Sequence, residues 1–279
     1  MIRATTADRP AVEAFLERHI TTSMFPLSNL QRFGMEGGQR RAMHFWVRWR
    51  AGEITDLMSV SEEGMLFPQC PTACWGEVKT MLTGTAVKGI IGAAQQVKAL
   101  LPVLGLAETS GLYQEEPLYE LHLPDLKMPN RGGFSLRAIS DATRDLVIAW
   151  RHAYLEEVLL IPGENTTQKA VSDIDSYIAA DSHRVLFEGD TPVAMTGFNA
   201  TAARAVQIGG VYTPPEQRSR GLARAAVAMH LEQAMRKGAE RAILFAASVQ
   251  ACKAYEALGF QRIGRFTISA YEEPQVIYG

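Results

Sequence analysis

The sequence contains little that would stabilise a small extracellular protein. It has three cysteines in 279 residues. These are too few for a disulfide framework, so we expect a reducing, cytoplasmic environment. Cys70 and Cys74 have a spacing seen in metal sites, but no second pair of Cys or His lies near them in the sequence. We therefore expect these two residues to be small buried side chains, and we expect no metal.

A large excess of charge and long apolar runs are also missing. Lys plus Arg number 28 and Asp plus Glu number 30, so the net charge is −2. This balance argues against a general polyanion binder, and nucleic acid is not an expected partner. No apolar run approaches the roughly 20 residues that span a bilayer. The first 15 residues contain no apolar segment of the signal-peptide type, so no membrane partner is expected either.

The two halves of the chain repeat the same order of features. Each opens on a short extended piece followed by an amphipathic helix, continues with two strands joined at a glycine beside an acid, and closes with a strand–helix unit. The matching segments are 2–4 with 136–138, 44–47 with 183–186, and 89–106 with 243–260. Residues 129–133 are rich in helix and strand breakers. We therefore predict two α/β domains, at 1–129 and 134–279.

The second half alone contains a motif suited to binding an anion. Gly209 and Gly210 lie within a predicted strand, where paired glycines often mark a bulge or a close approach to the backbone. Gly221 then introduces a helix whose first N–H groups lack partners and carry the positive end of the helix dipole. Three arginines add positive charge around this turn: Arg218, Arg220 and Arg224. This combination is typical of a phosphate site.

These residues resemble the GNAT superfamily of acyl-CoA-dependent N-acyltransferases. Residues 218–223, Arg-Ser-Arg-Gly-Leu-Ala, match its R/Q-x-x-G-x-G/A signature. The next strand–helix unit, 248–260, resembles the family pattern Asn-x-x-Ala…Tyr…Gly-Phe, except that Ser248 replaces the Asn. The resemblance covers about residues 134–271. The first half looks like a degenerate copy without the pyrophosphate loop. The fold implied is two GNAT-like domains, each a mixed, mostly antiparallel twisted sheet flanked by helices.

The resemblance also implies roles for individual residues. Tyr255 matches the family tyrosine that donates a proton to the departing CoA sulfur. Ser248 replaces the Asn that contacts the pantetheine or an ordered water, which implies a weaker cofactor contact. The pantetheine arm would bond to the backbone of Val211 and Thr213, and a backbone N–H near Val211 would polarise the thioester carbonyl. The CoA diphosphate would be held by the loop Arg218, Ser219, Arg220, Gly221, Leu222 and Ala223.

The sequence assigns no general base. Many relatives place a Glu on the strand before the bulge, but this strand has Gln207, which cannot take a proton. His230 has helical spacing from apolar neighbours, so we expect a packed core or interface histidine. His183 precedes a predicted strand, and we expect it at the surface.

The implied activity is N-acyl transfer, most simply N-acetyl transfer. The acyl group would pass from acetyl-CoA or another acyl-CoA to an amine by direct attack in a ternary complex. The acceptor would be a small molecule or a peptide, and a homodimer is left open. A non-catalytic acyl-CoA-binding sensor or assembly module is the alternative, which the Gln at 207 favours and Tyr255 disfavours. A purely structural duplication that serves dimerisation would bind no CoA.

Overall fold

A computed structural model of the chain describes all residues except 36, 107–110, 131 and 160–165. The chain divides into two compact units. Unit 1 consists of Met1–Pro117 together with Gly264–Gly279, and unit 2 consists of Leu118–Ile263. The sequence-based division at 129 and 134 differs from these units at both ends of unit 2. Within the breaker run at 129–133, residue 131 lies outside the described residues.

The described residues of unit 1 form seven strand segments and four α-helices. Its helices are α1 (Arg9–Arg18), α2 (Ile20–Phe33), α3 (Trp75–Leu82) and α4 (Ala94–Leu104). Its strands are β1 (Ile2–Arg3), β2 (Met43–Arg50), β3 (Glu53–Ser61), β4 (Met65–Gln69) and β5 (Ala86–Ala93), with most of β12 (Gln261–Val276) and the first part of β6 (Gly111–His122).

Unit 2 contains the rest of β6 and the following elements in chain order. Its helices are α5 (Arg144–Glu157), α6 (Thr166–Ala179), α7 (Leu222–Arg236) and α8 (Val249–Glu256). Its strands are β7 (Phe134–Ala138), β8 (His183–Glu188), β9 (Thr191–Ala202), β10 (Ala205–Tyr212) and β11 (Arg241–Phe245).

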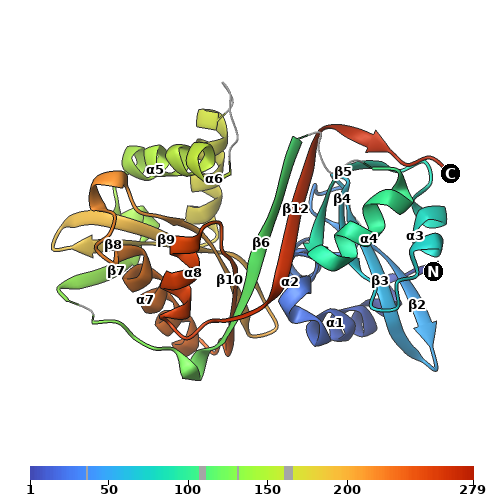
Figure 1. Cartoon of the computed structure of the whole chain (residues 1–279), viewed down its shortest axis with the longest axis horizontal. Helices are drawn as coiled ribbons and strands as arrows, with labels where there is room; N and C mark the ends of the chain where they lie inside the picture. The colour runs from blue at the N-terminus through green and yellow to red at the C-terminus, as the bar shows by residue number, and fades with distance from the viewer. Residues whose placement is uncertain (36, 107–110, 131, 160–165) are drawn as a thin grey trace. The chain divides into compact units, whose positions relative to one another are not determined.

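The sheets of the two units follow one plan. In unit 1, β1 to β4 pair antiparallel in sequence order, β4 pairs parallel with β5, and β5 pairs antiparallel with β12. In unit 2, β7 to β10 pair antiparallel in order, β10 pairs parallel with β11, and β11 pairs antiparallel with β6. Each sheet is therefore mixed and mostly antiparallel, with flanking helices (Figure 1). The predicted fold class is confirmed.

The two units exchange their last strands. Each sheet is completed by the strand that follows the last helix of the other half of the chain. In the duplicated plan, β6 follows α4 as β12 follows α8. However, β12 pairs with β5, from Phe266 opposite Ala93 to Val276 opposite Ala86. The end of β6 pairs with β11, from Leu118 opposite Phe245 to His122 opposite Arg241. This exchange is why Gly264–Gly279 belongs to unit 1.

Alternating side chains along the strands of unit 2 face different helices. Val185 and Phe187 on β8 pack in a core cluster with Val147 and Trp150 of α5 and with α6. Leu186, between them, packs instead with α7. Since successive strand residues point to opposite faces, α5 and α6 cover one face of this sheet and α7 covers the other.

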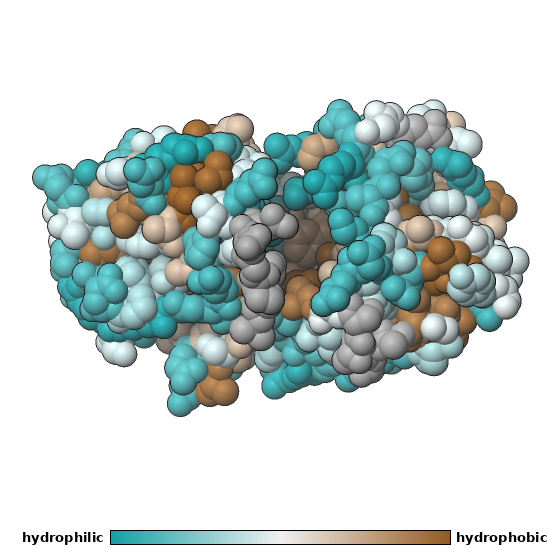
Figure 2. Space-filling view, turned by 90° about the horizontal axis from the view of Figure 1, so that it is seen from above, coloured by the Kyte–Doolittle hydropathy of each residue, from teal (hydrophilic) through white to brown (hydrophobic). Residues whose placement is uncertain are grey.

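In unit 1, α3 and α4 pack with β3, β4 and β5 in a core cluster that Ile277, close to the C-terminus, also joins. In Figure 2 the hydrophobic residues at the surface form separate groups among hydrophilic ones. None of the helices in the described part of the chain combines the length and apolar character needed to cross a membrane.

His230 on α7 is a buried histidine whose environment penalises its charged form. Its ring stacks on Phe198 with ring centroids 3.8 Å apart, and only 3% of the residue is exposed. Burial, with smaller contributions from the charges of Arg184 and Lys237, lowers the pKa of His230 from 6.5 to about 3. The sequence-based expectation of a packed core histidine is confirmed.

We expect acidification to destabilise unit 2 through His230. Its folded-state pKa is depressed, so the unfolded chain takes up the proton first, and stability is lost as the pH falls from 6.5 toward about 3. At pH 5 the loss is about 2 kcal/mol for one histidine. Urea unfolding of the full chain at pH 7 and pH 5 measures this loss. It should shrink in His230→Gln but not in the more exposed control His152→Gln. An equal loss in wild type and His230→Gln would contradict the assignment.

Candidate functional site

Strand β10 separates from its parallel neighbour halfway along its length. The two strands pair from Ala205 opposite Arg241 to Ile208 opposite Leu244. Beyond Ile208, residues 209–212 continue beside β9 alone among the described strands. The β11 side of this stretch therefore presents an unpaired backbone edge, to which an extended ligand can bond as an added strand.

Two consecutive glycines create the irregularity that accompanies this separation. The pairing of β10 with β9 shifts register between Gly209 and Tyr212, so the predicted bulge is confirmed. A Cβ on Gly209 would lie 1.9 Å from the Asn199 side chain. A Cβ on Gly210, whose φ is +61°, would lie 2.7 Å from His183 Nε2. Neighbouring side chains fill the space above both glycines, so neither position accepts a larger residue without movement.

The loop after β10 leads into an uncapped helix end. Helix α7 begins at Leu222, with Gly221 before it in a left-handed conformation at φ +76°. No side chain caps this end of the helix. Ser219 is also left-handed, at φ +66°. Alternating conformations of this kind turn successive N–H groups toward one concave surface, which favours an anion.

These features surround a pocket of about 840 Å³ in unit 2. All of the predicted site residues line it except Arg220. They are Val211, Thr213, Arg218, Ser219, Gly221, Leu222, Ala223, Ser248 and Tyr255. The rest of the lining comes mainly from the end of α5, the residues after β11, and α8. The predicted residues of the second half therefore meet around one cavity.

Two of the three arginines near the pocket are ion-paired. Arg218 contacts Glu157 at 2.5 Å and also donates to the Thr213 carbonyl at 2.9 Å. Glu157 thereby raises the pKa of Arg218. Arg220 forms two bonds to the Glu188 carboxylate, at 2.8 and 2.9 Å. By contrast, Arg224 lines the pocket, and its buried Nε has no hydrogen-bond partner among the described residues.

Ser248 and Tyr255 both belong to α8 and its N-terminus. Ser248 is the N-cap of the helix, and its hydroxyl accepts from the Ala251 N–H at 3.1 Å. Its side chain therefore has a local structural partner while it lines the pocket. Tyr255 is 9% exposed and packs edge-on against Phe260, with ring centroids 5.9 Å apart. The same ring thus belongs to the core of unit 2 and to the pocket wall.

The sequence-based expectation that His183 lies at the surface is wrong. His183 is the first residue of β8 and fully buried, and its ring stacks on Tyr177 at 3.5 Å. Burial lowers its pKa well below the ordinary value. The expectation failed because α6, which supplies Tyr177, covers the start of the strand. His183 Nε2 has no hydrogen-bond partner among the described residues, and it lies beneath the bulge at Gly210.

Gln207 and Tyr212 are two further side chains near the site, and each donates a hydrogen bond. Gln207 is buried, and its amide donates to the Ile208 carbonyl at 2.7 Å. Tyr212 packs against Trp150 with centroids 6.3 Å apart, and burial raises its pKa.

Glu157 is the site residue that sequence reasoning missed. It is the single carboxylate among the described residues that line the pocket. It lies near the end of α5, far from the motif in sequence, and no local pattern marks it. Only the packing of α5 against the sheet brings it to Arg218.

Comparison with known proteins identifies the domain around this pocket. Residues 146–260 match the model of the acetyltransferase (GNAT) family. No curated protein matches the chain.

Among solved structures, a GCN5-related N-acetyltransferase from Sphaerobacter thermophilus is 18% identical. The similarity covers 100% of this chain and 96% of that one, with a TM-score of 0.54. A GNAT-family acetyltransferase from Colwellia psychrerythraea is 13% identical over 98% and 100%, also at 0.54. A tandem GNAT protein from the clavulanic acid biosynthesis pathway is 11% identical over 96% of each chain, at 0.56. Residues 146–260 therefore match the acetyltransferase (GNAT) family, and the chain shares its fold along nearly its whole length with solved GNAT proteins.

Proposed function

We propose that the protein transfers an acyl group, most simply acetyl, from acyl-CoA to the amine of a small molecule or peptide. The observation that carries this proposal is the pocket at the point where β10 separates from β11, beside the uncapped end of α7. A strand edge and a helix N-terminus on one cavity suit a ligand with an extended amide-containing arm and a diphosphate. The pocket volume of about 840 Å³ lies within the usual range for such ligands.

Different groups of the chain bind different parts of acyl-CoA along the pocket. The N–H groups at the start of α7 and the Arg224 guanidinium face the diphosphate. The backbone of Val211 and Thr213 bonds the pantetheine arm, and the N–H of Val211 donates to the carbonyl oxygen as negative charge develops there. The thioester supplies the activated acyl group, the neutral acceptor amine attacks it directly in a ternary complex, and the proton that the amine nitrogen then loses passes to water.

Tyr255 is proposed as the proton donor to the departing sulfur. Its position in the pocket wall and its packing against Phe260 support this role, since a fixed ring holds the hydroxyl in one orientation. We assign no base. The only carboxylate among the described lining residues, Glu157, is held by Arg218.

The second candidate is a non-catalytic acyl-CoA-binding module. It is favoured by Gln207, which stands on the strand where many GNAT relatives have a Glu and whose amide donates to the Ile208 carbonyl. Both candidates predict acyl-CoA binding, and only the first predicts turnover.

Acetyl-CoA binding is the first test of the proposal. Titration calorimetry should detect binding to the wild type and a loss of about 100-fold or more in Gly221→Glu, because a carboxylate there repels the diphosphate. The matched control is Gly189→Glu. Gly189 is also left-handed, at φ +61°, and an added Cβ there meets nothing within 4 Å. Circular dichroism verifies folding of both variants. Absence of binding to the wild type would overturn both CoA-dependent functions.

Glu157 is expected to oppose CoA binding, since Arg218 must exchange a carboxylate for a phosphate. Glu157→Gln should therefore tighten acetyl-CoA binding by about 3- to 10-fold, with a larger effect at low ionic strength. Asp145→Asn removes the same charge from an exposed position on the same helix and should leave the affinity unchanged. Weaker binding in Glu157→Gln would instead mean that Glu157 holds Arg218 in its binding position.

Replacement of Tyr255 separates the two candidates. If the protein is a transferase, Tyr255→Phe should lower kcat by about 100-fold and leave acetyl-CoA affinity intact. Release of CoA thiol with a panel of amines measures turnover, and Tyr278→Phe, at a tyrosine that is 77% exposed, is the control. A wild type that binds acetyl-CoA without turnover on any amine would favour the binding module.

A further inference from the structure

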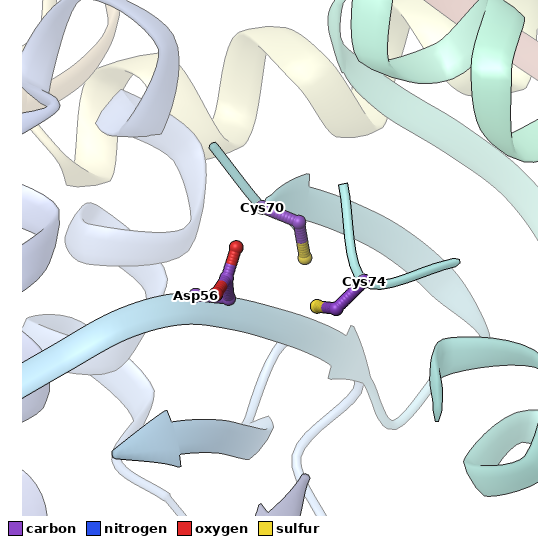
Figure 3. A group of neighbouring side chains, drawn as sticks. All are labelled: Asp56, Cys70 and Cys74. Carbon is purple, nitrogen blue, oxygen red and sulfur yellow. The ribbon is translucent and has the colours of Figure 1, made fainter. Parts of the chain in front are cut away.

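Unit 1 brings together three metal-binding side chains from separate positions in the chain. Asp56 lies on β3, Cys70 directly follows β4, and Cys74 directly precedes α3. Their ligand atoms all lie within 4.8 Å of one another. Figure 3 shows the two sulfur atoms and the carboxylate converging on a common space. Exposure of the three residues is 0%, 1% and 9%, so bulk water has little access.

The backbone between the two cysteines is folded to bring them together. The Ala73 N–H donates to the Cys70 carbonyl at 3.0 Å, which closes a turn. Ala73 adopts φ +53°, a conformation that alanine rarely takes, and this turns Cys74 back toward Cys70. The Cys-x-x-x-Cys spacing lies within the range found in zinc sites, and the carboxylate supplies the third ligand that the sequence did not reveal.

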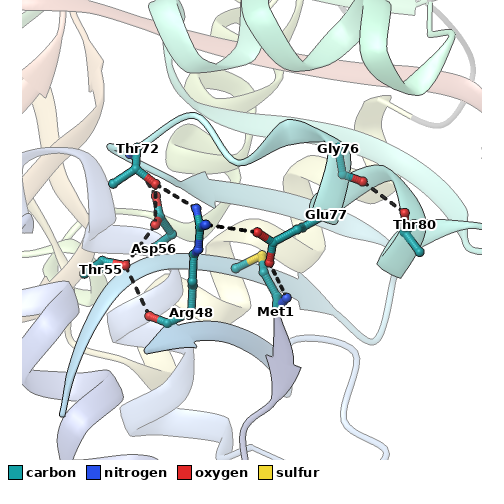
Figure 4. A network of polar contacts seen from close by, with 8 residues as sticks. All are labelled: Met1, Arg48, Thr55, Asp56, Thr72, Gly76, Glu77 and Thr80. Atoms are coloured by element: carbon teal, nitrogen blue, oxygen red, sulfur yellow. Dashed lines mark hydrogen bonds and ion pairs between the residues drawn. The ribbon is translucent and has the colours of Figure 1, made fainter. Parts of the chain in front are cut away.

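Asp56 is oriented as metal-bound carboxylates usually are. The Thr72 N–H donates to its Oδ1 at 2.8 Å, and the Thr72 hydroxyl donates to its Oδ2 at 2.6 Å (Figure 4). Thr55 adds a third contact to Oδ2, at 3.0 Å. These bonds fix the carboxylate while leaving lone-pair capacity on Oδ1, because an ionised carboxylate has about four acceptor positions. Hydrogen bonds of this kind commonly orient a ligand toward its metal.

The charge of the cluster calls for a cation. Asp56 is fully buried, and among the described residues it has no ion pair with Lys, Arg or His. Arg48 is the nearest positive side chain in its network, but it bonds to Thr72 at 3.3 Å and to Glu77 at 3.3 Å rather than to Asp56. A buried carboxylate beside two thiols is costly without positive charge.

The two cysteines of the cluster lie in the loop of unit 1 that corresponds to the loop beside the pocket of unit 2. The unit 2 loop suits an anion, whereas the cluster suits a cation. In unit 2 the loop between β10 and α7 contains the uncapped helix end and the arginines. The corresponding loop of unit 1, between β4 and α3, contains Cys70 and Cys74 instead. Where one copy of the plan presents donors for an anion, the other presents two thiols and a carboxylate.

We propose that Asp56, Cys70 and Cys74 bind one Zn²⁺ ion, with water as the fourth ligand of a tetrahedral site. Zinc prefers this combination of thiolate and carboxylate ligands. Binding forms two Zn–S bonds and one Zn–O bond and releases the two thiol protons to solvent, so no oxidant or reductant is needed. The resulting charge of −1 faces the Arg48 network. The ion ties the loop between β4 and α3 to β3, and this role is independent of acyl transfer.

Metal titration of the full chain tests the site. Chelator-treated, reduced protein is titrated with Zn²⁺ against a chromophoric competitor, and bound metal is measured by mass spectrometry. One Zn²⁺ per chain is expected, with affinity lowered by about 100-fold in Cys70→Ser, Cys74→Ser and Asp56→Asn. The chain has a third cysteine, Cys252, in unit 2, so Cys252→Ser is a matched control that should bind as the wild type does. Undiminished affinity in Cys70→Ser or Cys74→Ser would overturn the proposal.

Cobalt substitution gives a readout that depends on the thiolates themselves. Co²⁺ should produce thiolate-to-metal charge-transfer absorption in the wild type and Cys252→Ser, and weaker or no absorption in Cys70→Ser and Cys74→Ser. Asp56→Asn should keep part of this absorption at higher metal concentration. An unchanged cobalt spectrum and zinc affinity in Asp56→Asn would exclude the carboxylate from the ligand set.

The wild-type chain alone provides a test that does not depend on variants folding. Zn²⁺ should slow alkylation of Cys70 and Cys74 in reduced protein without changing the rate at Cys252, as measured on tryptic peptides. Equal alkylation with and without Zn²⁺ would overturn the proposal. So would a Cys70–Cys74 disulfide in the unreduced chain combined with no zinc binding after reduction.

Discussion

The separation of β10 from β11 is the constraint on which the functional half of this structure depends. Pairing ends at Ile208 opposite Leu244, one residue before β11 itself ends at Phe245, whereas β10 continues to Tyr212. At this point Gly209 and Gly210 leave room for the side chains of Asn199 on β9 and His183 on β8. A side chain at either glycine would collide with them. The open strand edge, this irregularity and the start of α7 all border the same pocket.

The exchange of β6 and β12 explains why the sequence predicts the plan of the units better than their boundaries. Local patterns reveal strands, helices and their order, and these recur in both halves as expected. Which strand completes which sheet is a long-range choice, since β6 and β12 follow equivalent helices and can satisfy equivalent edges. Here β12 pairs with β5, and the end of β6 pairs with β11. No pattern within either strand distinguishes this arrangement from the unexchanged one.

The same distinction separates the site residues that could be predicted from those that could not. The loop residues and Tyr255 lie within one stretch of chain, where spacing carries the information. Glu157 and Asp56 reach their partners only through tertiary packing, so no local sequence pattern marks either residue. His183 was misplaced for a related reason: a polar residue at the start of a strand is often exposed, but Tyr177 of α6 covers this one.

The electrostatics of the pocket show why counting arginines in the motif overstates its positive charge. Arg218 and Arg220 already face carboxylates, Glu157 and Glu188, and both pairs are well exposed. Ion pairs at such exposure are weak, so they reduce the local field while remaining exchangeable. Arg224 is different, because its Nε is buried in the first turn of α7 without a hydrogen-bond partner among the described residues. An unsatisfied buried donor beside a helix N-terminus gains most from an incoming anion. If the pocket binds acyl-CoA as proposed, the helix end and Arg224 would provide the specificity for its diphosphate, and Arg218 would contribute only after releasing Glu157.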